Sequence, residues 1–137
     1  MSQSDKPANY DKGKAMRTKV LGEAYVSKAV ANPADFAAPL QDIVTSYAWG
    51  TVWPREGLEP KLRSIVTVSM LIALNRPTEL KLHMRGALNN GVTPEQLREI
   101  IIHGSVYCGF PAAMDSMRQA KALLEELAQE GVVDNSN

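Results

Sequence analysis

The chain has very few residues of the kinds that carry redox or metal chemistry. Among its 137 residues there is one cysteine, Cys108, and there are two histidines. A single cysteine excludes an intramolecular disulfide and a Cys-x-x-Cys redox centre, and it argues against a thiolate zinc site. The sequence also has no run of about 20 apolar residues, the length that a transmembrane helix requires. We therefore expect no disulfide, no thiolate metal site and no membrane span.

The chain also lacks net charge, because its 15 basic and 15 acidic residues cancel. A neutral chain is not attracted to nucleic acid or to an anionic membrane surface, so neither is an expected partner. Hydrophobic residues make up 45% of the sequence, as in an ordinary globular protein that buries one core. The first ten residues are polar and lack the apolar stretch of a signal peptide, so we expect a cytoplasmic location.

Apolar residues recur at helical spacing, and glycines and prolines separate the segments. The predicted helices are 11–21, 23–31, one that has Asn32 as its N-cap and Pro33 at its first position and ends near Gly50, two that begin at Pro60 and Pro77, one that begins at Pro94, and 111–129. In the third of these, Phe36, Leu40, Ile43, Val44 and Tyr47 recur at helical spacing, and in the last, Met114, Met117, Leu124 and Leu127 are expected to point inward.

Thr93 and Gln96 have the spacing of a capping box at the start of the helix that begins at Pro94. No segment shows the alternation of a strand. The sequence therefore predicts an all-α fold, a single-domain bundle of about six or seven helices over residues 11–131. Flexible ends are expected at 1–10 and 132–137. The basic residues between positions 12 and 19, Arg17 among them, are expected to form a solvated helix face.

Glu79 and His83 are the main candidates for chemistry, because they stand four residues apart in a segment predicted to be helical. At this spacing both side chains lie on one face and can touch. A carboxylate beside an imidazole fixes the tautomer and raises the pKa of the ring, which suits proton transfer. Two simpler interpretations stay open: a core histidine satisfied by a hydrogen bond, and a solvated glutamate in the first helical turn.

Four further residues could take part in chemistry or in binding. Arg63 and Arg85 each flank an apolar stripe, and arginine is the side chain that best clamps a carboxylate, although an ordinary salt bridge is the simpler interpretation. His103 could lie at the surface, and Cys108 is interpreted as a small buried hydrophobe rather than a nucleophile.

Tryptophans at positions 49 and 53 could wall a pocket or belong to the core. Metal binding is not expected, because Glu79 and His83 could act as ligands but a catalytic metal usually needs three.

Seven stretches of the sequence fall in the order of a known family. They are residues 48–50, 57–58, 62–64, 73–76, 79–83, 85–93 and 107–113. Together they resemble the carboxymuconolactone decarboxylase family over about residues 40–125, and residues 10–13 with 20–22 resemble the start of its decarboxylase branch. Tyr47 and the loop 53–58 depart from the family pattern, which bears on substrate choice.

The resemblance implies a fold, an activity and an assembly. It implies an all-helical fold of the alkylhydroperoxidase D type and a trimer or hexamer of identical subunits. The implied enzyme is a cofactor-free decarboxylase of aromatic catabolism, which converts 4-carboxymuconolactone to the β-ketoadipate enol-lactone and releases CO₂. In the peroxidase branch the motif is Cys-x-x-Cys-x-x-x-His. His83 matches its histidine, whereas Arg76 and Glu79 replace its cysteines, so thiol peroxidase activity is not expected.

The resemblance also implies roles for the candidate residues. Arg63 or Arg85 would anchor the carboxylate that the small substrate retains, and His83, oriented by Glu79, would deliver a proton. The apolar walls around the departing carboxylate would be Trp49, Trp53, Tyr107 and Phe110. The alternative is a helical oligomer of the same family that binds small acids or acts on another lactone.

Overall fold

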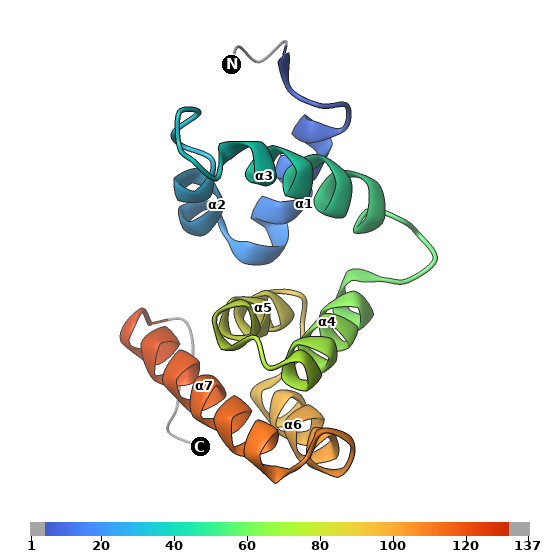
Figure 1. Cartoon of the computed structure of the whole chain (residues 1–137). Helices are drawn as coiled ribbons and strands as arrows, with labels where there is room; N and C mark the ends of the chain where they lie inside the picture. The colour runs from blue at the N-terminus through green and yellow to red at the C-terminus, as the bar shows by residue number, and fades with distance from the viewer. Residues whose placement is uncertain (1–4, 132–137) are drawn as a thin grey trace. The chain divides into compact units, whose positions relative to one another are not determined.

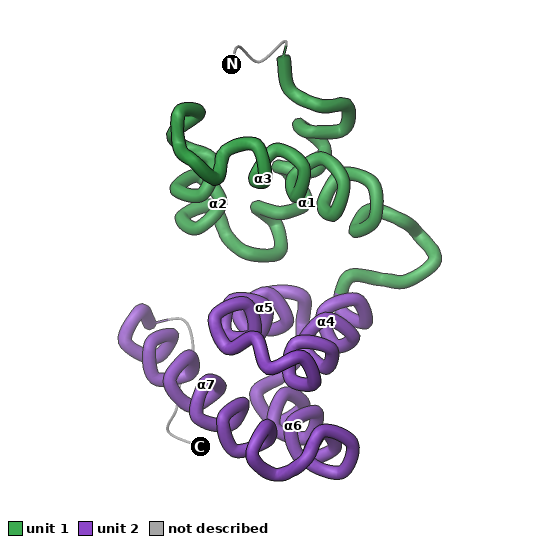
Figure 2. Tube along the Cα trace, in the orientation of Figure 1, with its two compact units in different colours: residues 1–60 green, residues 61–137 purple. Residues whose placement is uncertain are grey.

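The computed structural model describes residues 5–131, and every regular element within that range is a helix (Figure 1). The predicted all-α class is therefore confirmed. The helices form two compact units, residues 1–60 and 61–137 (Figure 2). The predicted single domain over 11–131 stays a prediction, and residues 1–4 and 132–137 of its expected flexible ends lie outside the described range. Across 5–131, no helix is both long and apolar enough to cross a membrane.

The first unit consists of α1 (Tyr10–Leu21), α2 (Glu23–Ala29), α3 (Ala38–Ile43) and the π-helix η2 (Val44–Val52). Helix α1 packs against η2. Two glycines permit this close approach. A Cβ atom at Gly13 would lie 1.8 Å from the carbonyl oxygen of Thr45, and one at Gly50 would lie 2.4 Å from that of Asn9.

The third predicted helix begins later than expected. Residues 32–37 form turns, and α3 begins only at Ala38. The side chain of Asn32 accepts a hydrogen bond from the N–H of Ala34, and that of Asp35 accepts one from the N–H of Ala37. Both bonds span two residues and stabilise turns rather than a helix start. Asn32 was therefore wrongly predicted as an N-cap.

The apolar stripe of this segment is exposed rather than buried. Phe36, Leu40, Ile43 and Tyr47 are all more than half exposed, and the buried positions of α3 and η2 include the polar residues Asp42, Thr45 and Ser46. These polar groups find partners inside the unit: Asp42 pairs with Lys6 at 2.8 Å, and Ser46 donates to the carbonyl oxygen of Asp42. The partners of these polar side chains therefore determine which face of α3 and η2 is buried.

The second unit contains α4 (Pro60–Leu74), α5 (Pro77–Asn89), α6 (Pro94–Cys108) and α7 (Phe110–Gln129). Three of these helices begin at the predicted prolines. The capping box is confirmed, because Thr93 Oγ1 accepts from the N–H of Gln96 and the side chain of Gln96 accepts from the N–H of Thr93, each at 3.0 Å. Helix α7 packs against α5 and α6.

The core of this unit draws on all four helices. Its most buried members include Val68, Met84, Ile101 and Leu123, one from each helix. Met114 was wrongly predicted to point inward, since it is 55% exposed near the start of α7.

Candidate active site

His83 lies in the middle of α5, where the helix passes from its buried to its exposed side. The side chain is half-buried and its Nδ1 atom is buried, whereas Leu80, Met84 and Ala87 on the same helix are in the core. A ring in this position can present one nitrogen to the protein and the other to a ligand.

Glu79 is exposed in the first turn of α5, one turn before His83. Among residues 5–131 no hydrogen bond or ion pair joins the Glu79 carboxylate to His83. This is the arrangement of a solvated glutamate at a helix N-terminus, where the helix dipole favours a negative charge. The Glu79–His83 pair therefore stays a prediction, which requires the glutamate side chain to turn toward the ring.

Arg85 is held by Glu130, the residue just after α7. Its Nη1 and Nη2 atoms donate to the two carboxylate oxygens of Glu130 at 3.2 and 3.1 Å. The Arg85 guanidinium lowers the pKa of the Glu130 carboxyl below its ordinary value, first through these hydrogen bonds and then through charge attraction. One turn earlier on α5, Lys81 pairs with Glu126 of α7. Arg85 thus matches the simpler interpretation, a salt bridge between helices.

Arg63 is the better placed of the two arginines. It is half-buried on α4, and its Nε atom is buried. The next residue, Ser64, is fully buried and accepts a hydrogen bond from the amide nitrogen of Asn90 at 2.9 Å, which ties this part of α4 to the residue just after α5. The helix that carries Arg63 is therefore fixed against the end of the helix that carries His83.

Trp49 and Trp53 stack on each other in the first unit. Their ring centroids lie 4.6 Å apart with an angle of 17° between the planes, and both side chains are buried. Trp49 belongs to η2 and Trp53 follows it directly. π-Helices are rare and occur often at functional sites. The two stacked rings form one buried apolar surface. This arrangement fits both predicted roles, a pocket wall and part of the core.

Tyr107 and Phe110 lie at the exposed corner between α6 and α7. They are 77% and 74% exposed, and Gly109 makes the sharp turn between them with a φ of 90°. The ring centroids of Tyr107 and His103 lie 5.1 Å apart. Both side chains line a groove beside α6. His103 is exposed, in agreement with the interpretation that it lies at the surface. Cys108 is half-buried and lines the same groove.

The candidates therefore fall into separate groups. Trp49 and Trp53 belong to the first unit, and the other eight belong to the second. Within the second unit, Tyr107 lines the groove, but neither His83 nor Arg63 is among the residues that line it. In the part of the chain that the structure describes, no group of three or more His, Cys, Asp or Glu side chains could hold a metal ion.

Arg17 is a buried residue that sequence reasoning missed. It was wrongly assigned to a solvated face, since it is only 4% exposed. Its Nη1 atom donates to Gln41 at 2.8 Å and to Thr45 at 3.2 Å, and its guanidinium lies over the ring of Tyr25. The signal was its position four residues after the tightly packed Gly13, on the inner face of α1. Arg17 holds the junction of α3 and η2.

Comparison with known proteins assigns the family. The model of the carboxymuconolactone decarboxylase family matches residues 38–122. The chain belongs to this family, as its sequence predicts.

Two relatives with assigned activities match most of the chain. It is 42% identical to the 4-carboxymuconolactone decarboxylase of Acinetobacter baylyi over 118 residues, which are 86% of this chain and 88% of that protein. It is 41% identical to the nitrosuccinic acid decarboxylase of Metarhizium robertsii over 122 residues, which are 89% of this chain and 85% of that protein. Both relatives are decarboxylases, which supports the predicted class of enzyme over the binding-module alternative.

Proposed function

We propose that the protein is a decarboxylase of a small acid that keeps a second carboxylate after CO₂ has left, with 4-carboxymuconolactone as the first candidate substrate. The observation that carries this proposal is the 42% identity to a 4-carboxymuconolactone decarboxylase across nearly the whole of both chains. With this substrate the enzyme would serve the protocatechuate branch of aromatic catabolism.

Nitrosuccinic acid is the second candidate, because a nitrosuccinic acid decarboxylase matches at almost the same identity. The two acids share a chemical feature. Each carries one carboxylate from which loss of CO₂ leaves a carbanion next to an electron-accepting group, the unsaturated lactone in one and the nitro group in the other. Each also retains another carboxylate. The common substrate class is therefore a diacid with its own electron sink.

The reaction breaks one carbon–carbon bond. Its electron pair stays on the substrate and spreads onto a lactone or nitro oxygen, CO₂ leaves, and carbon then takes up a proton. Because the substrate supplies the electron sink, the protein needs to supply only a charge partner, a proton donor and an apolar site for the departing carboxylate. No step requires an oxidant or a cofactor.

His83 is the proposed proton donor, because it is a half-buried titratable group on α5 and matches the histidine of the peroxidase-branch motif. Glu79 lies one turn away on the same face and would orient the ring. Arg63 is the proposed anchor of the retained carboxylate, because it is half-buried on α4, which Ser64 ties to Asn90 at the end of α5. Trp49, Trp53, Tyr107 and Phe110 stay the proposed apolar walls.

The test is to give the purified protein 4-carboxymuconolactone and nitrosuccinic acid in parallel and to measure the CO₂ released. Release from the first acid alone would support the lactone decarboxylase, and release from the second alone would assign the other activity. Release from neither, with an increase in melting temperature on adding either acid, would contradict the proposal and favour a binding protein.

We also propose that the protein acts in the cytoplasm as an oligomer of identical subunits, a trimer or a hexamer. The composition of the chain supports the cytoplasmic location, and the family resemblance supports the oligomer.

A further inference from the structure

One face of α1 follows the π-helix η2. Asn9, the N-cap of α1, is followed at four-residue spacing by Gly13 and Arg17, so the three share this face. The Arg17 guanidinium donates to the Thr45 hydroxyl at 3.2 Å, and the side-chain amide of Asn9 donates to the Thr51 hydroxyl at 3.4 Å. Between them, the missing side chain of Gly13 leaves room for the carbonyl oxygen of Thr45. Helix α1 therefore contacts η2 near both of its ends.

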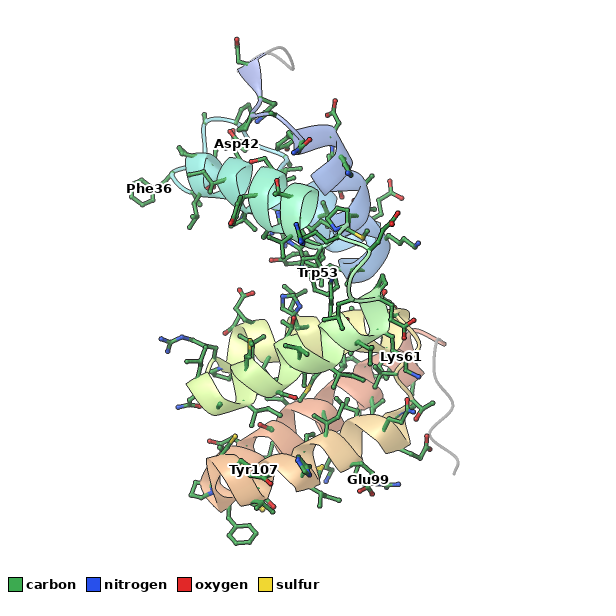
Figure 3. All side chains as sticks on the ribbon, turned by 90° about the vertical axis from the view of Figure 1, so that its right-hand side faces the viewer. Phe36, Asp42, Trp53, Lys61, Glu99 and Tyr107 are labelled. Atoms are coloured by element: carbon green, nitrogen blue, oxygen red, sulfur yellow. The ribbon has the colours of Figure 1, made fainter. Side chains whose placement is uncertain are left out.

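The π-helix sets the direction of the two tryptophans. The N–H of Trp53 donates to the carbonyl oxygen of Ala48, five residues earlier, at 2.9 Å. Asp42 of α3 and Trp53 bracket η2 in sequence, and both are labelled in Figure 3. Trp49 lies within η2 and stacks on Trp53. Because π-helices are rare, the packing around η2 must favour this conformation, and the stack depends on it.

Arg17 is the buried charge in the contact between α1 and η2. It is only 4% exposed, and its partners are the side chains of Gln41 and Thr45 and the ring of Tyr25, all neutral groups. Among residues 5–131 no carboxylate pairs with it. An apolar side chain of similar length would fill this space without the cost of removing a charge from water. Stability alone therefore does not account for an arginine at this position.

We propose that Arg17 is a positioning residue of the proposed decarboxylase and that it acts through η2 on the tryptophan pair. Its hydrogen bonds to Gln41 and Thr45 fix the end of α3 to the first turn of η2. With η2 held in this way, Trp49 and Trp53 stay stacked and buried, as an apolar wall for the departing carboxylate requires. The inference rests on the proposed function and adds a residue that affects the reaction only through other residues.

The kinetic test is Arg17→Met, which removes both hydrogen bonds and the buried charge but keeps a long side chain. We expect kcat to decrease by about 10- to 100-fold, because a displacement of about 1 Å far from the chemistry can cost roughly this factor. KM should stay within about two-fold of the wild type, because the wall acts on the departing carboxylate rather than on the retained one. Lys14→Met, at an exposed position of the same helix, is the matched control and should keep the wild-type kcat.

Tryptophan spectroscopy tests the positioning without any substrate. The chain has only two tryptophans, so selectively excited fluorescence and the circular dichroism of the coupled indole rings report on this pair alone. In Arg17→Met we expect weaker coupling between the rings and emission at longer wavelength, because the indoles gain contact with water. The spectra are taken at a temperature at which far-ultraviolet circular dichroism shows the full helix content. Lys14→Met should keep the wild-type spectra.

Thr45→Val tests whether Arg17 acts through η2. This variant removes one acceptor of Arg17 and leaves the arginine in place. It should change the tryptophan spectra and lower kcat in the same direction as Arg17→Met. Because the two residues share one interaction, the double variant should be less impaired than the product of the two single effects. Thr45→Val also carries the test if Arg17→Met does not fold.

A folded Arg17→Met variant with wild-type tryptophan spectra would overturn the positioning. Changed spectra with an unchanged kcat would overturn the role in the reaction. Two single effects that simply multiply in the double variant would show that Arg17 does not act through Thr45. A wild type that releases CO₂ from neither acid would refute the proposed function instead, and the spectra would still decide whether Arg17 holds the tryptophan pair.

Discussion

The two arginines beside the proposed site should respond differently to the same substitution. Arg85 donates to both oxygens of Glu130 at 3.2 and 3.1 Å, so its guanidinium is already occupied. Arg63 is half-buried on the helix that Ser64 ties to the end of α5. We therefore predict that Arg63→Gln impairs catalysis and that Arg85→Gln does not.

The size of the effect follows from the kind of bond that is lost. A hydrogen bond from a charged donor contributes about 1.5–3 kcal/mol, which corresponds to roughly a 10- to 100-fold decrease in kcat/KM for Arg63→Gln. Most of this decrease should appear as a higher KM, because the retained carboxylate is bound both before and after CO₂ leaves. For Arg85→Gln we expect kcat/KM within about two-fold of the wild type.

Glu130→Gln is the matched control for Arg85. Removing either partner breaks the same exposed ion pair, so both variants should show the same small decrease in melting temperature and unchanged kinetics. The assay is steady-state CO₂ release at several substrate concentrations, with a thermal melt of each variant. If Arg85→Gln raised KM tenfold while Glu130→Gln did not, Arg85 would bind substrate and the assignment to Arg63 would be refuted.

Two further predictions concern stability. Gly13→Ala should destabilise the first unit by about 1–3 kcal/mol, the usual cost of overpacking, because the added Cβ would lie 1.8 Å from the carbonyl oxygen of Thr45; chemical denaturation would measure this, and Gly57→Ala, where nothing lies within 4 Å, should have little effect. The stabilisation from the Arg85–Glu130 pair should be lost in acid. Since the folded-state pKa of Glu130 is lowered, this contribution is present above the unfolded pKa and disappears as the pH falls through the folded pKa. The difference in melting temperature between wild type and Glu130→Gln should therefore vanish at low pH, and a difference that persisted there would show that the pair is not its source.

Local signals predicted the second unit well. Pro77 and Pro94 mark helix starts because proline fits the first helical position, and Thr93 with Gln96 caps α6 through bonds that span only three residues. Such features depend on neighbours in sequence, so they can be read without knowledge of the fold. The spacing of Glu79 and His83 on one helix was readable for the same reason.

Features that depend on distant partners were not predictable. The burial of Asp42 depends on Lys6, and the burial of Arg17 depends on Gln41 and Thr45, 24 and 28 residues away. The π-helix η2 shifts the residues that face inward away from the usual helical spacing. Likewise, the ion pair between Arg85 and Glu130 joins residues 45 apart in sequence. The sequence alone therefore could not decide whether Arg63 or Arg85 anchors the carboxylate.

In the proposed decarboxylation, His83 delivers the proton. The most direct measurement is CO₂ release from 4-carboxymuconolactone by the wild type and by His83→Gln, with circular dichroism to verify that the variant folds. The wild type should turn the substrate over, and kcat should be lower by about 10²- to 10⁴-fold in the variant, the usual contribution of one positioned acid. Wild-type turnover in a folded His83→Gln variant would contradict this role of His83.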